Sequence, residues 1–432
     1  MSIASLGQTL LISGCALLAF AILYFIAARM PRATIVLFLM LVTLTTGSIG
    51  FYPSASLLGA SIYPADVFTL IFLSFGIFRQ LSNGHWSKLN ITAGLLTVLV
   101  GCGLLSWFIL DDLQTAVNHW RTLLLSLGVF WWATAQSQWS SRLLAPVVWV
   151  ALAGATIQTG LYLVHGFGSA SDGHWQEGIG WVSARPLEAS GALIMLCGLL
   201  LLIYRPGPWR PFRVAAIAYL AVSVVLCQHR SVWVAALVAG LFALVMVLKA
   251  RKLSSFLLVP AVALGAPLTI WTVSLLANSS ELESSATNTG TLDARFSFWS
   301  ERMAVARTTT QWLFGEVFGP TPISTDPRFT IEAHSMYIQI ITTLGIVGLI
   351  LFLALLTLSI RLLVFKTGQV HSVLFPAIIV FGFFYTWPAW SFMLLAQGRG
   401  PDPEAPSTID ITSSAANSMA AVDSTRVREW AT

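Results

Sequence analysis

The stretch "EAHSMYIQIITTLGIVGLILFL", residues 332–353, places a histidine directly before a long apolar run. From Met336 to Val364 the only charged side chain is that of Arg361. A run of this length spans a bilayer as a helix. Lipid offers the backbone no hydrogen-bond partners, and a helix satisfies its own N–H and C=O groups. The stretch therefore predicts a transmembrane helix with Glu332 and His334 at its watery end.

The composition extends this interpretation to the whole chain. Of its 432 residues, 56% are hydrophobic and 9% are charged, whereas a soluble protein carries roughly 25% charged residues. The net charge of +5 comes from basic residues in short loops, so we expect membrane lipid and no nucleic acid as a partner. The four cysteines form no CxxC pair, which argues against a zinc site or a disulfide.

The apolar runs predict an all-α polytopic membrane protein with about 12 transmembrane helices. The first run is too long and too weakly flanked for a cleaved signal peptide, so we expect it to be retained. The predicted spans are 8–28, 33–50, 65–78, 91–110, 122–136, 144–165, 188–204, 213–228, 231–249, 255–277, 336–364 and 372–397, the last being one span or two short ones around Pro388.

The basic residues indicate which loops face the cytoplasm. Arg and Lys cluster on alternate loops, at 28–32, 79–88, 136–142, 204–213, 249–252 and 361–366. The opposite, extracytoplasmic side then carries 51–64, 111–121, 165–187, 228–230 and the long segment 278–335. A loop as long as the last one is usually functional.

These assignments predict four parts. Residues 1–277 form an N-terminal bundle of transmembrane helices, and 278–335 form an extracytoplasmic loop that contains an amphipathic helix. Residues 336–397 form the C-terminal transmembrane helices. The tail 398–432 is polar and rich in Ser, Thr and Ala, which predicts disorder.

Three arginines and one histidine gather on the predicted extracytoplasmic side: Arg185, Arg230, Arg295 and His334. A phosphate group is held well by arginine, whose planar guanidinium stays charged at every working pH. Histidine titrates near neutral pH and is the commonest general base. Together they predict a site that binds an anion and transfers a proton.

Each of these residues also has a purely structural interpretation. Arg185 can pair with Glu188 at the start of a helix, which we favour for it, and Arg230 can reach headgroup phosphates. Arg295, followed by Phe296, Phe298, Trp299 and Arg302, can lie on a helix at the membrane surface. His334 can simply cap its helix, sharing a face with Tyr337.

Three motifs resemble the superfamily of bacterial O-antigen ligases and Wzy-type polymerases, which are GT-C-type membrane glycosyltransferases. "AHSMYIQIITTLGIVGLILFL" (333–353) is similar to the family signature that begins with His and ends in Leu-Gly-Ile-Gly-Leu. "RSVWVAAL" (230–237) resembles the Ser-Arg-Gly/Ser-x-Trp start of a span. "ARFSFWSERM" (294–303), followed by "WLFGEVFG" (312–319), resembles a Gly-Arg-x-x-x-Trp helix and its glycine turn, with Ala294 and Glu316 departing from the pattern.

The resemblance implies transfer of a glycan from an undecaprenyl diphosphate carrier to a hydroxyl, in the bacterial inner membrane. It assigns catalysis to His334, Arg230 and Arg295, and substrate binding to Arg185, Arg302, Tyr337 and Trp299. A chain-length regulator and export proteins are further candidate partners. The sequence shows no Walker A, GxGxxG or DxD pattern, so we expect no cofactor and no metal.

Three functions remain open at this point. A polymerase of lipid-linked repeat units is favoured by a short first half and by "YPADVFTLIFL" (63–73), which resembles exopolysaccharide polymerases of the xanthan type. A ligase that moves the glycan to another acceptor would share the donor chemistry. A flippase or transporter would require charged residues in the middle of spans, whereas this chain carries its charges at their ends.

Overall fold

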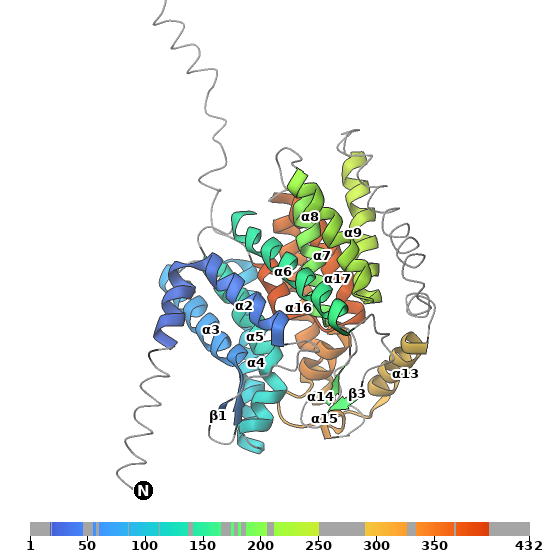
Figure 1. Ribbon diagram of the computed structural model, residues 1–432. Helices are drawn as coiled ribbons and strands as arrows, with labels where there is room; N and C mark the ends of the chain where they lie inside the picture. Colours follow the sequence, from blue (N-terminus) through green and yellow to red (C-terminus); the bar gives the residue numbers. More distant parts are fainter. Residues whose placement is uncertain are drawn as a thin grey trace, which may run out of the picture.

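A computed structural model of the protein describes the chain in fourteen pieces (Figure 1). They are residues 18, 20–45, 55–57, 60–84, 86–111, 113–136, 141–165, 174–176, 180–182, 187–204, 211–249, 290–325, 334–366 and 369–396. The predicted span 255–277, the tail 398–432, Glu332 and Arg185 lie outside the described residues.

The described chain is dominated by helices that follow the apolar runs of the sequence. They are α2 (Pro31–Thr45), α3 (Pro64–Asn83), α4 (Lys88–Leu110), α5 (Leu113–Ala135), α6 (Ser141–His165), α7 (Ala189–Tyr204), α8 (Pro211–Leu226), α9 (Arg230–Lys249), α13 (Gly290–Ala304), α14 (Thr309–Phe314), α15 (Pro322–Thr325), α16 (Met336–Lys366), α17 (Gln369–Phe384) and the 3-10 helix η2 (Ala389–Leu395). Two antiparallel hairpins join them: β1 (Ala55–Leu57) with β2 (Ala60–Ile62), and β3 (His174–Gln176) with β4 (Gly180–Val182).

These helices support the prediction of a multi-pass α-helical membrane protein. Within the described residues, four helices are long and apolar enough to cross a bilayer: Pro64–Asn83, Lys88–Leu110, Ala145–Leu163 and Met336–Arg361. Six apolar helices of 10–17 residues accompany them. The total of about 12 spans stays a prediction, and the two hairpins are a small departure from an all-α fold.

The predicted start of the span 122–136 was wrong, because α5 already begins at Leu113 and takes up most of the segment 111–121. Trp120 is fully buried in this extension, and its ring packs against Gly103 of α4. A β-carbon on Gly103 would lie 2.2 Å from that ring, so the absence of a side chain allows the approach. The burial of Ala116 and Trp120 holds the polar start of α5 in helical form.

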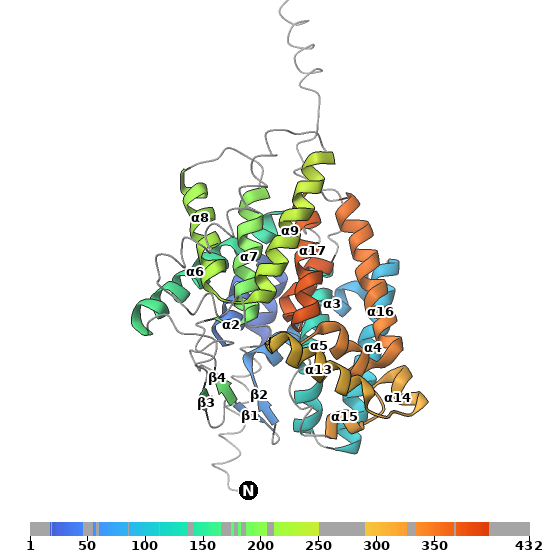
Figure 2. The ribbon, with the colours of Figure 1, turned by 90° about the vertical axis from the view of Figure 1, so that its right-hand side faces the viewer.

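The two hairpins and α13–α15 lie at one end of the helix bundle (Figure 2). We call this the loop end; it also contains the first residues of α9 and α16. Segments of the chain that are predicted to be extracytoplasmic are therefore brought together in space. In the bundle itself, α3 packs against α5, α6 against α7, and α9 against α17.

Helix α16 is interrupted at Gly345, whose φ of 68° and ψ of −168° are not helical. A β-carbon there would lie 2.4 Å from the backbone of Leu313 in α14, and one on Gly315 would lie 2.5 Å from the backbone of Thr343. The carbonyl of Thr343 accepts a hydrogen bond of 2.9 Å from the backbone N–H of Glu316. The glycine turn and the Leu-Gly signature thus form one backbone-to-backbone contact that only glycine permits.

The uncertain stretch 372–397 contains one apolar helix followed by a short 3-10 helix. α17 ends at Phe384, and η2 begins directly after Pro388. All seven residues of η2 are buried, so it packs inside the protein. Proline suits this position because its ring fixes φ and it has no N–H to leave unsatisfied.

Candidate functional site

Backbone strain marks two of the three motifs. Among the described residues other than glycine, positive φ occurs at Gln228 (55°) and at His334 (47°). Such a conformation is uncommon and costs energy for residues with a side chain. Strained residues of this kind gather at functional sites. One of them is the predicted base, and the other lies two residues before Arg230.

Tyr385, at the end of α17, connects the predicted base with a predicted arginine. The ring of His334 lies 5.4 Å from the Tyr385 ring, centroid to centroid. The guanidinium carbon of Arg295 lies 5.5 Å from the same ring, and Arg295 Nη1 donates a 2.9 Å hydrogen bond to the carbonyl of Phe384. We call His334, Arg295 and Tyr385 the His334 cluster. It joins residues from α13, α17 and the segment before α16.

The electrostatics of this cluster favour a neutral imidazole. Burial lowers the pKa of His334 below its usual value, and the positive charge of Arg295 lowers it further. A histidine in this setting is uncharged at neutral pH and can accept a proton. Arg295 therefore has two possible effects: it offers charge to an anion, and it keeps the neighbouring base unprotonated.

Arg230 is the first residue of α9 and is half-buried. The preceding His229 is 3% exposed, and its Nε2 donates a 2.8 Å hydrogen bond to the carbonyl of Leu187. This bond holds the turn before Arg230 against the start of α7. Because α9 packs along α17, Arg230 begins a helix beside the one that ends at Phe384, directly before Tyr385.

The other residues predicted to bind substrate occupy varied positions. Trp299 is half-buried on α13, with its ring edge-on to Phe296 at 5.2 Å. Tyr337 lies between α16 and α17, where its hydroxyl donates a 3.2 Å hydrogen bond to the carbonyl of Ile379. Arg302 is 4% exposed. Their roles, and that of Arg185 outside the described residues, stay predictions.

Sequence reasoning missed Tyr385 and His229. Tyr385 follows a span in "FFYTWPAW" (383–390) and is far along the chain from both of its partners, so no spacing indicated it. His229 had a local signal, since it stands directly before Arg230 in a tight turn between two spans. Over the described part of the chain, no three His, Cys, Asp or Glu side chains gather into a possible metal site.

Comparison with known families agrees with the motif analysis. A family model described as O-antigen ligase matches residues 215–353, a stretch shorter than half of the chain. It begins within α8 and ends within α16, so it contains Arg230, Arg295 and His334. No curated protein matches the chain. Over residues 215–353 the chain matches the O-antigen ligase family model, and this match confirms the resemblance to the O-antigen ligase and Wzy superfamily inferred from the three motifs.

Proposed function

We propose that this protein polymerises undecaprenyl-diphosphate-linked oligosaccharide repeats into a secreted polysaccharide at the outer face of the bacterial inner membrane. The family match supports action on lipid-linked glycans. The single observation that carries the proposal is the His334 cluster, in which a base with a lowered pKa and a guanidinium flank one tyrosine ring.

In this reaction the acceptor hydroxyl attacks the anomeric carbon of the donor. A new carbon–oxygen bond forms, and the bond from that carbon to the diphosphate breaks. His334 takes the proton of the hydroxyl. The undecaprenyl diphosphate leaves with the bonding electron pair, and Arg230 and Arg295 stabilise the negative charge that develops on it. The arginines supply this stabilisation without a metal ion, which makes the transfer metal-independent.

The proposed orientation places the loop end outside the cytoplasm. It follows from the alternation of Arg and Lys loops, because segments 51–64, 165–187 and 278–335 contribute the hairpins and the α13–α15 region. The diphosphate of a lipid carrier lies at the membrane surface. A base at the end of an apolar helix, as His334 is, would lie at the same depth.

A ligase is the second candidate, and the description of the matching family favours it. A ligase would move a finished glycan onto lipid A core or another acceptor by the same chemistry. The short first half of the chain and the 63–73 segment favour the polymerase. The two differ in the acceptor, so the product distinguishes them.

The decisive experiment replaces His334 with alanine in the full chain. We expect polymer formation to fall by about 10²–10⁴-fold, because a general base contributes that much. Binding of undecaprenyl diphosphate to the purified protein should change little, since the arginines remain. Lipid-linked single repeats should accumulate in cells. Asn118→Ala, an exposed change at the loop end, is the matched control.

Polymer of normal length and yield from the His334→Ala protein would remove His334 from the mechanism. If the wild-type enzyme attaches single repeats to an acceptor without extending them, the ligase replaces the polymerase. Normal donor binding together with lost transfer supports both the site and the reaction.

A further inference from the structure

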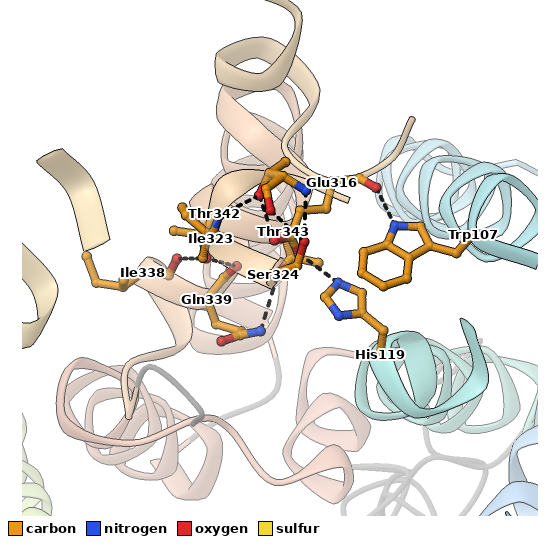
Figure 3. Close-up of polar contacts among 10 residues, drawn as sticks. Trp107, His119, Glu316, Ile323, Ser324, Ile338, Gln339, Thr342 and Thr343 are labelled. Atoms are coloured by element: carbon orange, nitrogen blue, oxygen red, sulfur yellow. Dashed lines mark hydrogen bonds and ion pairs between the residues drawn. The ribbon is translucent and has the colours of Figure 1, made fainter. Parts of the chain in front are cut away.

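A second polar cluster surrounds Glu316, in the turn after α14 (Figure 3). Its side chain is 1% exposed, yet its carboxylate accepts a 3.0 Å hydrogen bond from the Thr321 hydroxyl and lies 2.7 Å from Nε2 of His119. Its backbone carbonyl accepts a 2.8 Å hydrogen bond from the Trp107 indole. Together with its N–H bond to Thr343, Glu316 is tied to α4, α5 and α16.

His119 belongs to the polar start of α5, outside the segment that matches the family. Its ring stacks on that of Trp107 at 4.1 Å and nearly parallel, with an interplanar angle of 10°. The edge of Trp120 meets it at 5.2 Å. These two rings fix the imidazole so that Nε2 faces the Glu316 carboxylate (Figure 3).

Two arginines share the charge of this carboxylate. The pKa values of Arg302 and Arg307 are both lowered, because the effect of burial exceeds that of the Glu316 charge, which acts to raise them. Nη2 of Arg307 donates a 2.7 Å hydrogen bond to the carbonyl of Arg302, and its guanidinium lies 4.5 Å from the centre of the Trp312 ring. We call Glu316, His119, Arg302 and Arg307 the Glu316 cluster.

Arg307 has hydrogen-bonding capacity left in this arrangement. Within the described chain its Nε and Nη1 atoms are buried and have no hydrogen-bond partner. A guanidinium presents its donors in a flat fork that fits the oxygens of a phosphate or a carboxylate. Arg307 as a whole is half-buried, whereas Arg302 is nearly fully buried. The two unpaired nitrogens of Arg307 are themselves covered, so a ligand would reach them only when neighbouring side chains move aside.

The Glu316 cluster and the His334 cluster are joined by one helix. Arg295 and Arg302 both lie on α13, seven residues apart. Seven residues are about two helical turns, or roughly 10 Å, so the two side chains leave the same face of the helix. An extended ligand that has its reacting end at Arg295 and follows this face of α13 would pass the end of the helix, where Arg307 follows.

We propose that Arg307 binds an anionic group of the lipid-linked glycan, and that His119 positions it through the carboxylate of Glu316. This inference rests on the proposed function for the identity of the ligand. The anionic group is either the diphosphate or an acidic sugar of the repeat unit. Glu316 neutralises part of the arginine charge and fixes its place, and His119 keeps the carboxylate from turning away.

The test measures two affinities of the purified full chain in detergent, one for undecaprenyl diphosphate and one for the lipid-linked repeat unit. Arg307→Gln should weaken binding by about 10–100-fold, since a hydrogen bond to a charged group is lost. If both affinities fall, the group is the diphosphate. If only the affinity for the repeat unit falls, the group is an acidic sugar.

A pair of substitutions at His119 tests the positioning role. His119→Phe keeps a ring beside Trp107 but removes the nitrogen that lies 2.7 Å from the Glu316 carboxylate, and we expect a loss of affinity of about tenfold. His119→Gln keeps an amide N–H that can reach the carboxylate, and it should bind nearly as the wild type does. A merely structural role would lower the unfolding temperature of His119→Phe and leave both affinities unchanged.

Wild-type affinities in Arg307→Gln would overturn the binding role of Arg307, and equal losses in the two His119 variants would overturn the positioning role. The His334→Ala protein, assayed alongside, separates this inference from the proposed function. If His334→Ala abolishes polymer while Arg307→Gln binds both ligands normally, the inference fails and the proposed function stands. If His334→Ala makes normal polymer, the proposed mechanism fails whatever Arg307 does.

Discussion

Two histidines lie near arginines at the loop end of the molecule, but their charged neighbours differ. His334 lies across Tyr385 from Arg295, and the charge of that arginine acts on the imidazole directly. His119 faces Glu316, and the negative charge of this carboxylate also acts on Arg302 and Arg307. The first histidine has a strained backbone, whereas the second lies inside a regular helix.

From this comparison we propose that the neighbouring charge selects the role of each histidine. A cation without an intervening carboxylate disfavours the protonated imidazole, which leaves it free to accept a proton. A carboxylate at hydrogen-bonding distance engages one ring nitrogen and holds the ring in place. We therefore assign proton transfer to His334 and positioning to His119. The following predictions test this division.

Beyond the His334→Ala test, the largest effect should come from Arg230, which we propose to stabilise the leaving diphosphate. We expect Arg230→Ala to lower the transfer rate by about 10²–10³-fold, as the loss of one oxyanion-stabilising group does. Arg230→Lys should fail almost as badly, because a point-like ammonium does not reproduce the planar fork. Transfer by the purified enzyme from a lipid-linked donor measures both.

Near-normal transfer by Arg230→Lys would show that only positive charge matters at this position. The argument that the planar guanidinium is needed to bind an anion would then fail for Arg307 as well, because both proposals depend on it.

The backbone contact between α14 and α16 should be the next most sensitive feature. Gly345→Ala places a β-carbon against Leu313 and forces a side chain into positive φ. We expect it to destabilise the protein by about 2–4 kcal/mol, combining overpacking with backbone strain. Thermal unfolding in detergent measures the change, and Gly101→Ala, at a helical glycine with open space around it, is the control.

Gly345 also lies at different distances along α16 from the Glu316 cluster and the His334 cluster. The Glu316 turn rests on Thr343, two residues before the affected glycine, whereas His334 lies at the other end of the first segment of α16. A stability of Gly345→Ala equal to that of the Gly101 control would mean that the α14–α16 contact does not need glycine.

The smallest effect concerns pH. The lowered pKa of His334 means that its neutral form persists below the usual titration range of histidine. Transfer should therefore be lost only as the pH falls through this lowered pKa, because imidazolium cannot accept a proton. In Arg295→Gln one cause of the lowering is gone, so the acid limb of the residual activity should move to higher pH. Transfer rates over a pH series measure the shift.

An acid limb that stays in place in Arg295→Gln would show that Arg295 does not act on the base. Arg295→Lys, which keeps the charge, should leave the limb close to its wild-type position and serves as the matched control.

The sequence by itself determined the multi-pass helical character of the chain, the order of the three motifs and the choice of His334, Arg230 and Arg295 as candidate site residues. Each of these depends on local information. A bilayer requires an unbroken apolar run for a span, and positively charged loops mark one side of the membrane. The motifs lie within short windows of the chain, so they could be recognised without knowing how the chain folds.

The tertiary structure alone decided the contacts between distant segments. Gly345 lies in an uninterrupted apolar run, and its break becomes visible only where α14 touches it. Tyr385 joins His334 and Arg295 across three segments, and His119 reaches Glu316 from the N-terminal bundle. Side chains from separate helices meet because of how the helices pack, and packing depends on the whole set of helix surfaces, which no local pattern in the sequence records.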